Sequence, residues 1–135
     1  MTPQDLAKSG SEQGIQAAVF CWAALPDVRA RYPELRWLMA IPNGGFRFKA
    51  EAGRLKASGV KRGVPDTMLP VVRLPYYGLW LEFKKPGVGR LSVEQRGWID
   101  YLNSAGYLAM VVDDWELAAR RIISYLDGMT FGRLK

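Results

Sequence analysis

Two apolar runs joined by a short turn, at 67–74 and 79–84, are the sequence feature that most constrains the fold. Both runs are rich in the branched and aromatic residues that favour strands. Between them, Pro75, Tyr76 and Gly78 are residues typical of turns. Because so short a connection joins antiparallel strands, we expect the two runs to pair in that way.

Helical and strand patterns alternate along the rest of the chain. Ser9 and Glu12 have the spacing of a capping box, and apolar residues then recur at helical spacing over about 11–25. The stretch 26–33 is expected to be a short basic connection. A strand is expected over 35–41, closed by a turn at 42–45, and a solvent-facing helix over 46–59. A further helix is expected from a capping box of Ser92 and Gln95 to about 106. A strand over 107–112 and a last helix capped by Asp113 or Asp114 complete the pattern.

This order of elements favours an α/β fold, a sandwich around a small mixed β-sheet. The helix before the last strand supplies one crossover connection, and the short turn supplies the antiparallel pair. The length of 135 residues fits one domain over 1–135, with a core over about 9–126.

The chain lacks the marks of export. No apolar stretch approaches the roughly 18 residues of a membrane span, and the start of the chain lacks the apolar segment of a signal peptide. The single Cys21 cannot build a disulfide framework or a cysteine zinc site within one chain. We therefore expect a protein of the reducing cytoplasm that does not enter a membrane.

Charge and composition narrow the function. The net charge is +6 and the isoelectric point is about 9.7, a balance that favours polyanions such as nucleic acid. The sequence contains no histidine, which excludes serine–histidine and cysteine–histidine catalysis and histidine-ligated zinc. Hydrolysis by this chain would therefore use carboxylates, lysine and a metal ion.

The two apolar runs carry charges near their ends. Strand side chains alternate between faces, so Trp80, Glu82 and Lys84 share one face of the second run. Antiparallel pairing is expected to bring Asp66 close to Lys84, with Glu82 a short step along the same edge. Three charges would then meet at one corner of the sheet.

The first helix offers a fourth charged residue. Glu12 and Gln16 are one turn apart, on the stripe that contains Ile15 and Val19, so both can face the sheet. An inward carboxylate has to be paired, hydrogen-bonded or bound to metal.

Each of these residues also has a purely structural explanation. Asp66 can begin a strand or accept turn hydrogen bonds, and Glu82 with Lys84 can form a solvated cross-strand ion-pair row. Glu12 and Gln95 can serve only as helix-capping residues. The residues taken one by one leave both explanations open.

The ordered set of Glu12, Pro65-Asp66 and Glu82-Phe83-Lys84 resembles the PD-(D/E)XK nuclease superfamily. Within it, the chain is similar to the virus-type replication-repair nuclease family, VRR-NUC, in its small phage-like form. The similarity spans about 9–126 and includes IPNGG at 41–45, the basic segment at 53–66 and LSVEQ at 91–95. It implies a restriction-endonuclease-like core, with a small mixed sheet flanked by helices.

The resemblance implies metal-dependent hydrolysis of phosphodiester bonds. Asp66 and Glu82, with the backbone carbonyl of Phe83 and with Glu12 as a further candidate ligand, would hold Mg²⁺ or Mn²⁺ through oxygen. Lys84 would position the attacking water or neutralise charge in the transition state. Gln95 would help to orient the nucleophile.

The expected substrate is DNA, and branched DNA such as Holliday junctions or flaps follows from the family alone. A run of cations between 47 and 62 would contact the DNA backbone, and a glycine-containing turn would allow close approach to a phosphate. The resemblance also favours a homodimer working in DNA replication and repair, in the cytoplasm of a bacterial or phage-infected cell. The alternative is a non-catalytic DNA-binding accessory derived from a nuclease fold. The candidate DNA-binding residues are Asn43, Gly44, Arg47, Lys49, Arg54, Lys56, Lys61 and Arg62.

Overall fold

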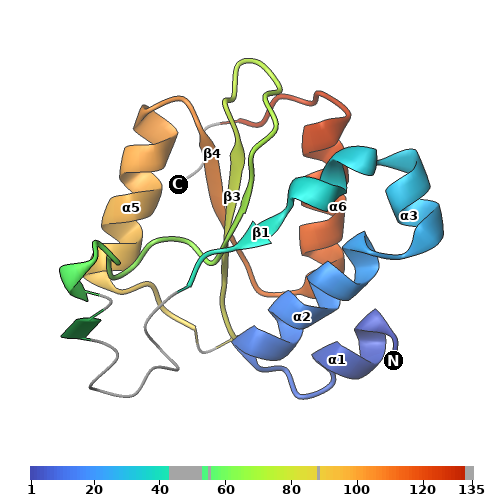
Figure 1. The fold of residues 1–135 in the computed structure, drawn as a ribbon, viewed down its shortest axis with the longest axis horizontal. Helices are drawn as coiled ribbons and strands as arrows, with labels where there is room; N and C mark the ends of the chain where they lie inside the picture. Colours follow the sequence, from blue (N-terminus) through green and yellow to red (C-terminus); the bar gives the residue numbers. More distant parts are fainter. Residues whose placement is uncertain (43–52, 55, 88, 133–135) are drawn as a thin grey trace.

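The structure is a computed structural model that describes residues 1–42, 53–54, 56–87 and 89–132. Its centre is a four-stranded mixed sheet in the order β1-β2-β3-β4 (Figure 1). The strands are β1 (Met39–Ala40), β2 (Thr67–Leu69), β3 (Leu79–Phe83) and β4 (Leu108–Val112). The first three pair antiparallel and β4 pairs parallel to β3, which confirms the expected mixed sheet with one crossover.

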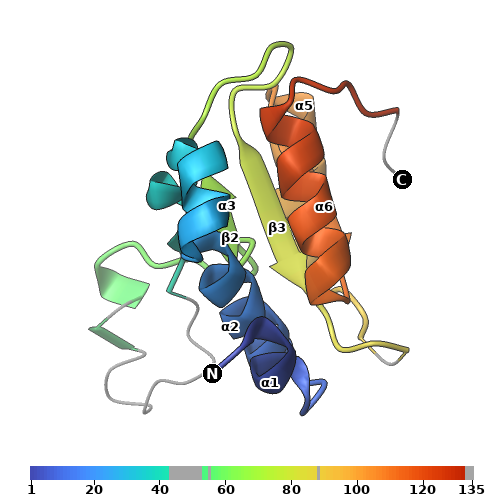
Figure 2. The same cartoon turned by 90° about the vertical axis from the view of Figure 1, so that its right-hand side faces the viewer.

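Helices cover both faces of this sheet, as Figures 1 and 2 show together. On one face lie α2 (Glu12–Ala23) and α6 (Trp115–Leu126), and on the other lies α5 (Val93–Ser104). The fold is therefore an α/β sandwich.

The main core lies between the sheet and the α2/α6 layer. Leu79, Leu81 and Phe83 of β3 alternate along the strand and are at most 1 % exposed. They pack with Val19 of α2 and Ile122 of α6 in one buried cluster. Because strand neighbours point to opposite faces, the residues between them face α5.

Local capping signals fix where the helices begin. The Ser92 side chain accepts a hydrogen bond from the Gln95 backbone, and the Gln95 side chain bonds back to the Ser92 backbone, so the expected capping box is confirmed. Asp114 caps α6. At α2 the expected box was wrong, because Ser11, not Ser9, is the N-cap and accepts from the Gly14 backbone at 3.0 Å.

Prolines account for most of the other differences from expectation. The expected basic connection contains helix α3 (Pro26–Arg31), and the first half of the strand expected at 35–41 is a 3₁₀ helix, η1 (Pro33–Trp37). Proline presets the φ angle of a first helical turn, which favours both helices. Pro70 likewise ends β2 early because it has no N–H for the ladder.

Two further regions also differ from or exceed the expected layout. A short helix that was not expected, α1 (Pro3–Ala7), begins with its own capping box and packs against α2. The turn expected at 42–45 and most of the helix expected at 46–59 lie outside the described residues, although 53–54 and 56–57 are helical. Within the described part of the chain, no helix combines the length and apolar character needed to cross a membrane.

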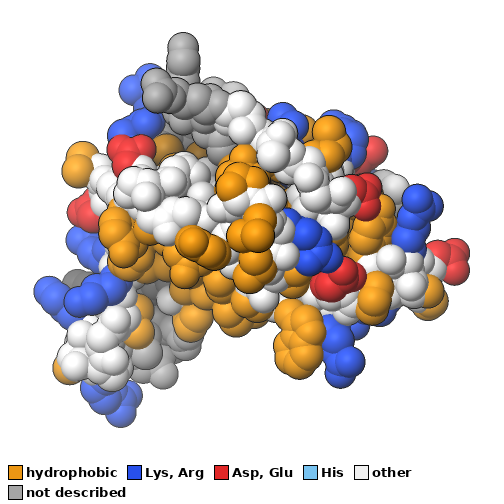
Figure 3. All heavy atoms as spheres, turned by 90° about the horizontal axis from the view of Figure 1, so that it is seen from above, with side chains coloured by type: hydrophobic (Ala, Val, Ile, Leu, Met, Phe, Trp, Pro, Cys, Tyr) orange, Lys and Arg blue, Asp and Glu red, His pale blue; other side chains and the backbone are white. Residues whose placement is uncertain are grey.

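The connection at 70–78 forms an apolar end of the molecule. Val72, Leu74 and Tyr77 are 54 %, 74 % and 55 % exposed. Figure 3 looks onto this end and shows apolar side chains gathered there. It lies at the opposite end of β3 from Glu82.

The loop before β2 is fitted tightly against the start of α5. Gly63 has a φ of +84°, and a Cβ atom there would lie 2.6 Å from the backbone carbon of Glu94 and 2.7 Å from the backbone nitrogen of Gln95. One turn further along α5, the Trp98 ring nitrogen donates to the Arg62 carbonyl at 3.1 Å. This packing sets the position of the segment that leads into β2 relative to α5.

We expect Gly63→Ala to lower the free energy of unfolding more than Gly59→Ala does. Both glycines have positive φ, +84° and +100°, so each alanine costs roughly 1–2 kcal/mol of backbone strain. Only at 63 does the new Cβ meet another segment, which adds about 1–3 kcal/mol of overpacking, whereas nothing lies within 4 Å at 59. Urea unfolding followed by circular dichroism measures both losses. Equal losses would contradict the tight fit against α5.

Candidate active site

A fully buried carboxyl group lies at the centre of the candidate site. Glu82 is the fourth residue of β3 and is 1 % exposed. Its neighbours Leu81 and Phe83 point into the main core, so Glu82 points to the α5 face with Trp80 and Lys84. A side chain of this type is rarely buried without a partner.

Asp66 is the partner of Glu82 on the neighbouring strand segment. The pairing of Thr67 with Leu81, continued by one residue, places Asp66 opposite Glu82. Asp66 Oδ2 accepts a hydrogen bond from the Phe83 backbone N–H at 2.8 Å, which holds the two strand ends together. Asp66 was expected close to Lys84, with Glu82 a short step along the same edge. The observed register places Asp66 opposite Glu82, two residues before Lys84.

The surroundings of Glu82 favour its neutral form. Burial raises the pKa of Glu82 to about 9, and the hydrogen bond with Asp66 and the negative charge of Asp66 act in the same direction. The charge of Lys84 lowers this pKa, and the charge of Glu12 raises it slightly further. Within the described residues, Glu82 Oε1 is buried and has no hydrogen-bond partner. The site thus has two adjacent carboxyl groups, and one buried oxygen of Glu82 has no hydrogen-bond partner among the described residues.

Lys84 adds a buried cation on the same face. It is 9 % exposed, and its backbone N–H donates to the Val112 carbonyl at 2.9 Å, which continues the β3–β4 ladder by one residue. Its charge stabilises the ionised form of Glu82. The expected convergence of Asp66, Glu82 and Lys84 therefore holds at one end of β3.

Gln95 reaches the same site from α5. Its Nε2 donates to Glu82 Oε2 at 3.4 Å, while its Oε1 accepts from the Ser92 backbone N–H at 2.9 Å. The capping bond fixes the orientation of the amide, so that its N–H₂ end is left to face Glu82. Gln95 therefore caps α5 and also contacts Glu82.

Glu12 lies at the margin of the site. It is the first residue of α2 and is exposed, so it contributes to Glu82 only through its charge. Among the residues that the structure describes, no three histidine, cysteine, aspartate or glutamate side chains are gathered closely enough for one metal ion. The acidic part of the site in this structure is the pair formed by Asp66 and Glu82.

The candidate DNA-binding residues divide into two groups. Arg54, Lys56, Lys61 and Arg62 are exposed, and the Arg62 backbone contacts α5 through Trp98. The others lie outside the described residues: Asn43, Gly44, Arg47 and Lys49.

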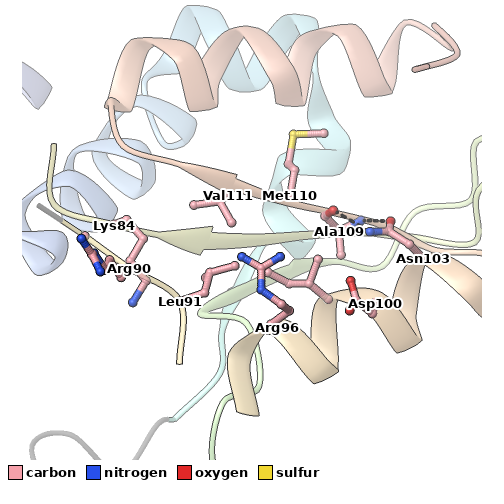
Figure 4. Close-up of a pocket in the computed structure, with 11 residues that line it drawn as sticks. Lys84, Arg90, Leu91, Arg96, Asp100, Asn103, Ala109, Met110 and Val111 are labelled. Atoms are coloured by element: carbon pink, nitrogen blue, oxygen red, sulfur yellow. Dashed lines mark hydrogen bonds between the residues drawn. The ribbon is translucent and has the colours of Figure 1, made fainter. Parts of the chain in front are cut away.

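The structure also reveals a groove that the sequence interpretation missed. It has a volume of about 610 Å³, lies beside Lys84 and is walled by α5 and β4 (Figure 4). Arg90 and Arg96 line it together with Lys84. Arg90 and Arg96 are six residues apart, one in a loop and one at the start of a helix, so neither a helical nor a strand periodicity pairs them. The signal in the sequence was that one cation precedes and one follows the capping box of Ser92 and Gln95.

Comparison with known proteins finds similar domains. The family model described as the VRR-NUC domain matches residues 11–114. A solved structure described as a VRR_NUC domain protein is similar with a TM-score of 0.73 and 27 % sequence identity, covering 90 % of this chain and 93 % of that one. The comparison with curated proteins finds no match. With most of its length matched by the family model, the chain belongs to the VRR-NUC family of nuclease domains.

Proposed function

We propose that the protein is a divalent-metal-dependent DNA endonuclease, and that Asp66, Glu82, Lys84 and Gln95 form its catalytic centre. The observation that carries this proposal is the buried carboxyl pair, in which one oxygen of Glu82 has no partner among the described residues, beside a buried lysine. Burying a carboxylate without a partner costs free energy, and such groups cluster at functional sites.

The donor set fits a hard divalent cation. Asp66 and Glu82 would hold Mg²⁺ or Mn²⁺ through carboxylate oxygens, which such ions prefer. We propose the Phe83 carbonyl as a further ligand, because the Phe83 N–H is bonded to Asp66 and keeps this residue beside the carboxyl pair. Glu12 is not gathered with Asp66 and Glu82 around one ion position in the described structure, so we propose that it acts at the margin of the site through its charge. A bound cation of this kind acts as a Lewis acid toward phosphate and lowers the pKa of a coordinated water.

The remaining residues have distinct roles in hydrolysis. As water attacks phosphorus and the alkoxide leaves, negative charge builds up on the phosphoryl oxygens. The ammonium group of Lys84 is preorganised to neutralise that charge because the β3–β4 ladder fixes its backbone. Gln95 holds Glu82 Oε2 and keeps that carboxylate in one orientation.

We expect Asp66→Asn, Glu82→Gln and Lys84→Met each to reduce DNA cleavage by at least about 100-fold, the usual cost of removing a charged group from such a centre. Each variant keeps the side-chain size and removes the charge. The measurement is the cleavage rate of supercoiled and branched DNA with Mg²⁺ or Mn²⁺, and EDTA should abolish it. Lys85→Met is the matched control, since Lys85 is exposed and adjacent.

Gln95 can be tested in the same assay against Ser92. Both Gln95→Ala and Ser92→Ala break the capping box, but only Gln95→Ala loses the contact with Glu82. Cleavage should fall further in Gln95→Ala. DNA that is bound but left uncut by the wild-type protein with either metal would favour the non-catalytic accessory.

The raised pKa of Glu82 predicts how stability changes with pH. In the unfolded chain Glu82 loses its proton above the ordinary value of 4.5, whereas in the folded protein it keeps the proton up to about 9. The folded state then binds more protons, so in metal-free buffer this residue destabilises the fold as pH rises from 5 to 9, by at most about 1.4 kcal/mol per pH unit.

The measurement is the free energy of unfolding in urea with EDTA, for the wild type and Glu82→Gln. The variant stays neutral, so its curve should fall less steeply over this pH range. Mg²⁺ at pH 8 should stabilise the wild type more than the variant. Parallel pH curves for the two proteins would contradict the burial of an ionisable pair.

We also propose that the enzyme acts on branched DNA as a homodimer, with the apolar end at 70–78 as the contact surface. Exposed apolar surface of this kind marks interaction sites, and two twofold-related centres suit a four-way junction. Sedimentation velocity should find a dimer that Leu74→Ser weakens by at least several-fold. A monomer at all concentrations would overturn the dimer, and an unaffected variant would overturn the surface.

A further inference from the structure

We propose that the groove between α5 and β4 holds one unpaired strand of DNA beside the scissile phosphate, with Arg90 and Arg96 bound to its backbone. This inference rests on the proposed nuclease function and assigns the part of the substrate that the groove receives. Three observations carry it: where the cations lie, the fact that they are not paired, and the shape and ending of the groove.

The cations line the groove next to the carboxyl pair. Figure 4 shows Lys84 and Arg90 together at one end, with Arg96 reaching from α5 toward the sheet. Lys84 belongs both to this groove and to the site that contains Glu82. A strand lying in the groove therefore passes directly into the proposed catalytic centre.

The turn after β3 is built to bring Arg90 close to Lys84. The Gly89 N–H donates to the Lys85 carbonyl at 3.0 Å, so the chain curls back on itself. A Cβ atom at Gly89 would lie 2.8 Å from the Lys84 Cβ, which only glycine avoids at this separation. The second cation, Arg96, is fixed by its place in the first turns of α5.

Neither arginine forms an ion pair within the described structure. Among the described residues, the one ion pair joins Arg73 to Glu34. The side chains of Arg90 and Arg96 form no hydrogen bond with any described residue. Three cations in one groove repel each other unless an anion or water separates them. A phosphate backbone supplies regularly spaced anions and releases its counterions on binding.

The dimensions of the groove favour one strand over a duplex. Its volume of about 610 Å³ is of the size that takes a short, narrow ligand. A duplex is wider than its own major groove of about 12 Å, so it is too wide to enter a cavity of this volume. Leu91, Ile99 and Val111 add apolar surface for sugars and bases.

The far end of the groove is closed to both phosphate and peptide. Asp100 lies there and repels phosphate (Figure 4). Asn103 pairs with the edge of β4, donating to the Ala109 carbonyl at 3.1 Å and accepting from the Ala109 N–H at 2.9 Å. Since these bonds occupy the N–H and the carbonyl of Ala109, a peptide strand cannot pair with β4 at this position.

The test is DNA binding in EDTA, where no cutting occurs, measured by fluorescence anisotropy. The probes are a single strand, a blunt duplex and a fork with one unpaired arm. Arg90→Ala and Arg96→Ala should each weaken binding of the single strand and the fork by several-fold and leave the duplex within about twofold. Each should also reduce the salt dependence of single-strand binding by roughly 0.7 in log–log slope.

Arg120→Ala and Arg121→Ala are the matched controls, because both arginines are exposed on α6, across the sheet from the groove. Equal effects from the α6 variants, an unchanged single-strand affinity in the groove variants, or no binding of any probe would overturn the inference. Thermal unfolding checks that each variant is folded.

The same variants separate this inference from the proposed function. A wild-type protein that cuts DNA while its groove variants bind and cut like the wild type would refute the groove alone. A protein that never cuts, yet loses single-strand affinity in the groove variants, would refute the nuclease and keep the groove.

Discussion

The burial of Glu82 is the constraint on which the site depends. A carboxyl group at 1 % exposure, next to a second carboxyl group, has to share a proton, bind a cation or be offset by a nearby positive charge. The protein supplies Lys84 and the amide of Gln95 but leaves Glu82 Oε1 without a partner in the described structure. An oxygen without a hydrogen-bond partner at this depth lowers the stability of the fold, and it is the acceptor that the proposed metal ion would use.

The scaffold tolerates this cost because the site is held from several directions. Asp66 is tied to the Phe83 backbone, and the loop before it rests on α5 through Gly63 and Trp98. On the other face of the sheet, β3 contributes side chains to the main core. Rigid elements on both faces therefore fix the charged side chains before any ligand arrives, which is the arrangement that electrostatic catalysis requires.

The two ends of the sheet differ in character. One end gathers the carboxyl pair, Lys84 and the cationic part of the groove, whereas the other carries the apolar connection at 70–78. Interior contacts anchor that connection, since Arg73 binds Glu34 and the Leu126 carbonyl, and Tyr125 donates to the Val71 carbonyl. The fold thus separates the surface proposed to bind nucleic acid from the surface proposed to bind a second copy of the chain.

The sequence by itself determined what depends on near neighbours. Strand alternation put Glu82 and Lys84 on one face, and the capping residues at 92 and 114 set the starts of two helices. The prolines at 26 and 33 begin two short helices and Pro70 ends β2, but the sequence analysis did not predict these effects. Only the tertiary structure decided that Asp66 faces Glu82, that Gln95 reaches it, and that two arginines from separate segments share a groove with Lys84. These relations depend on strand register and helix packing, which are set by contacts between residues far apart in the chain, and no local periodicity encodes them.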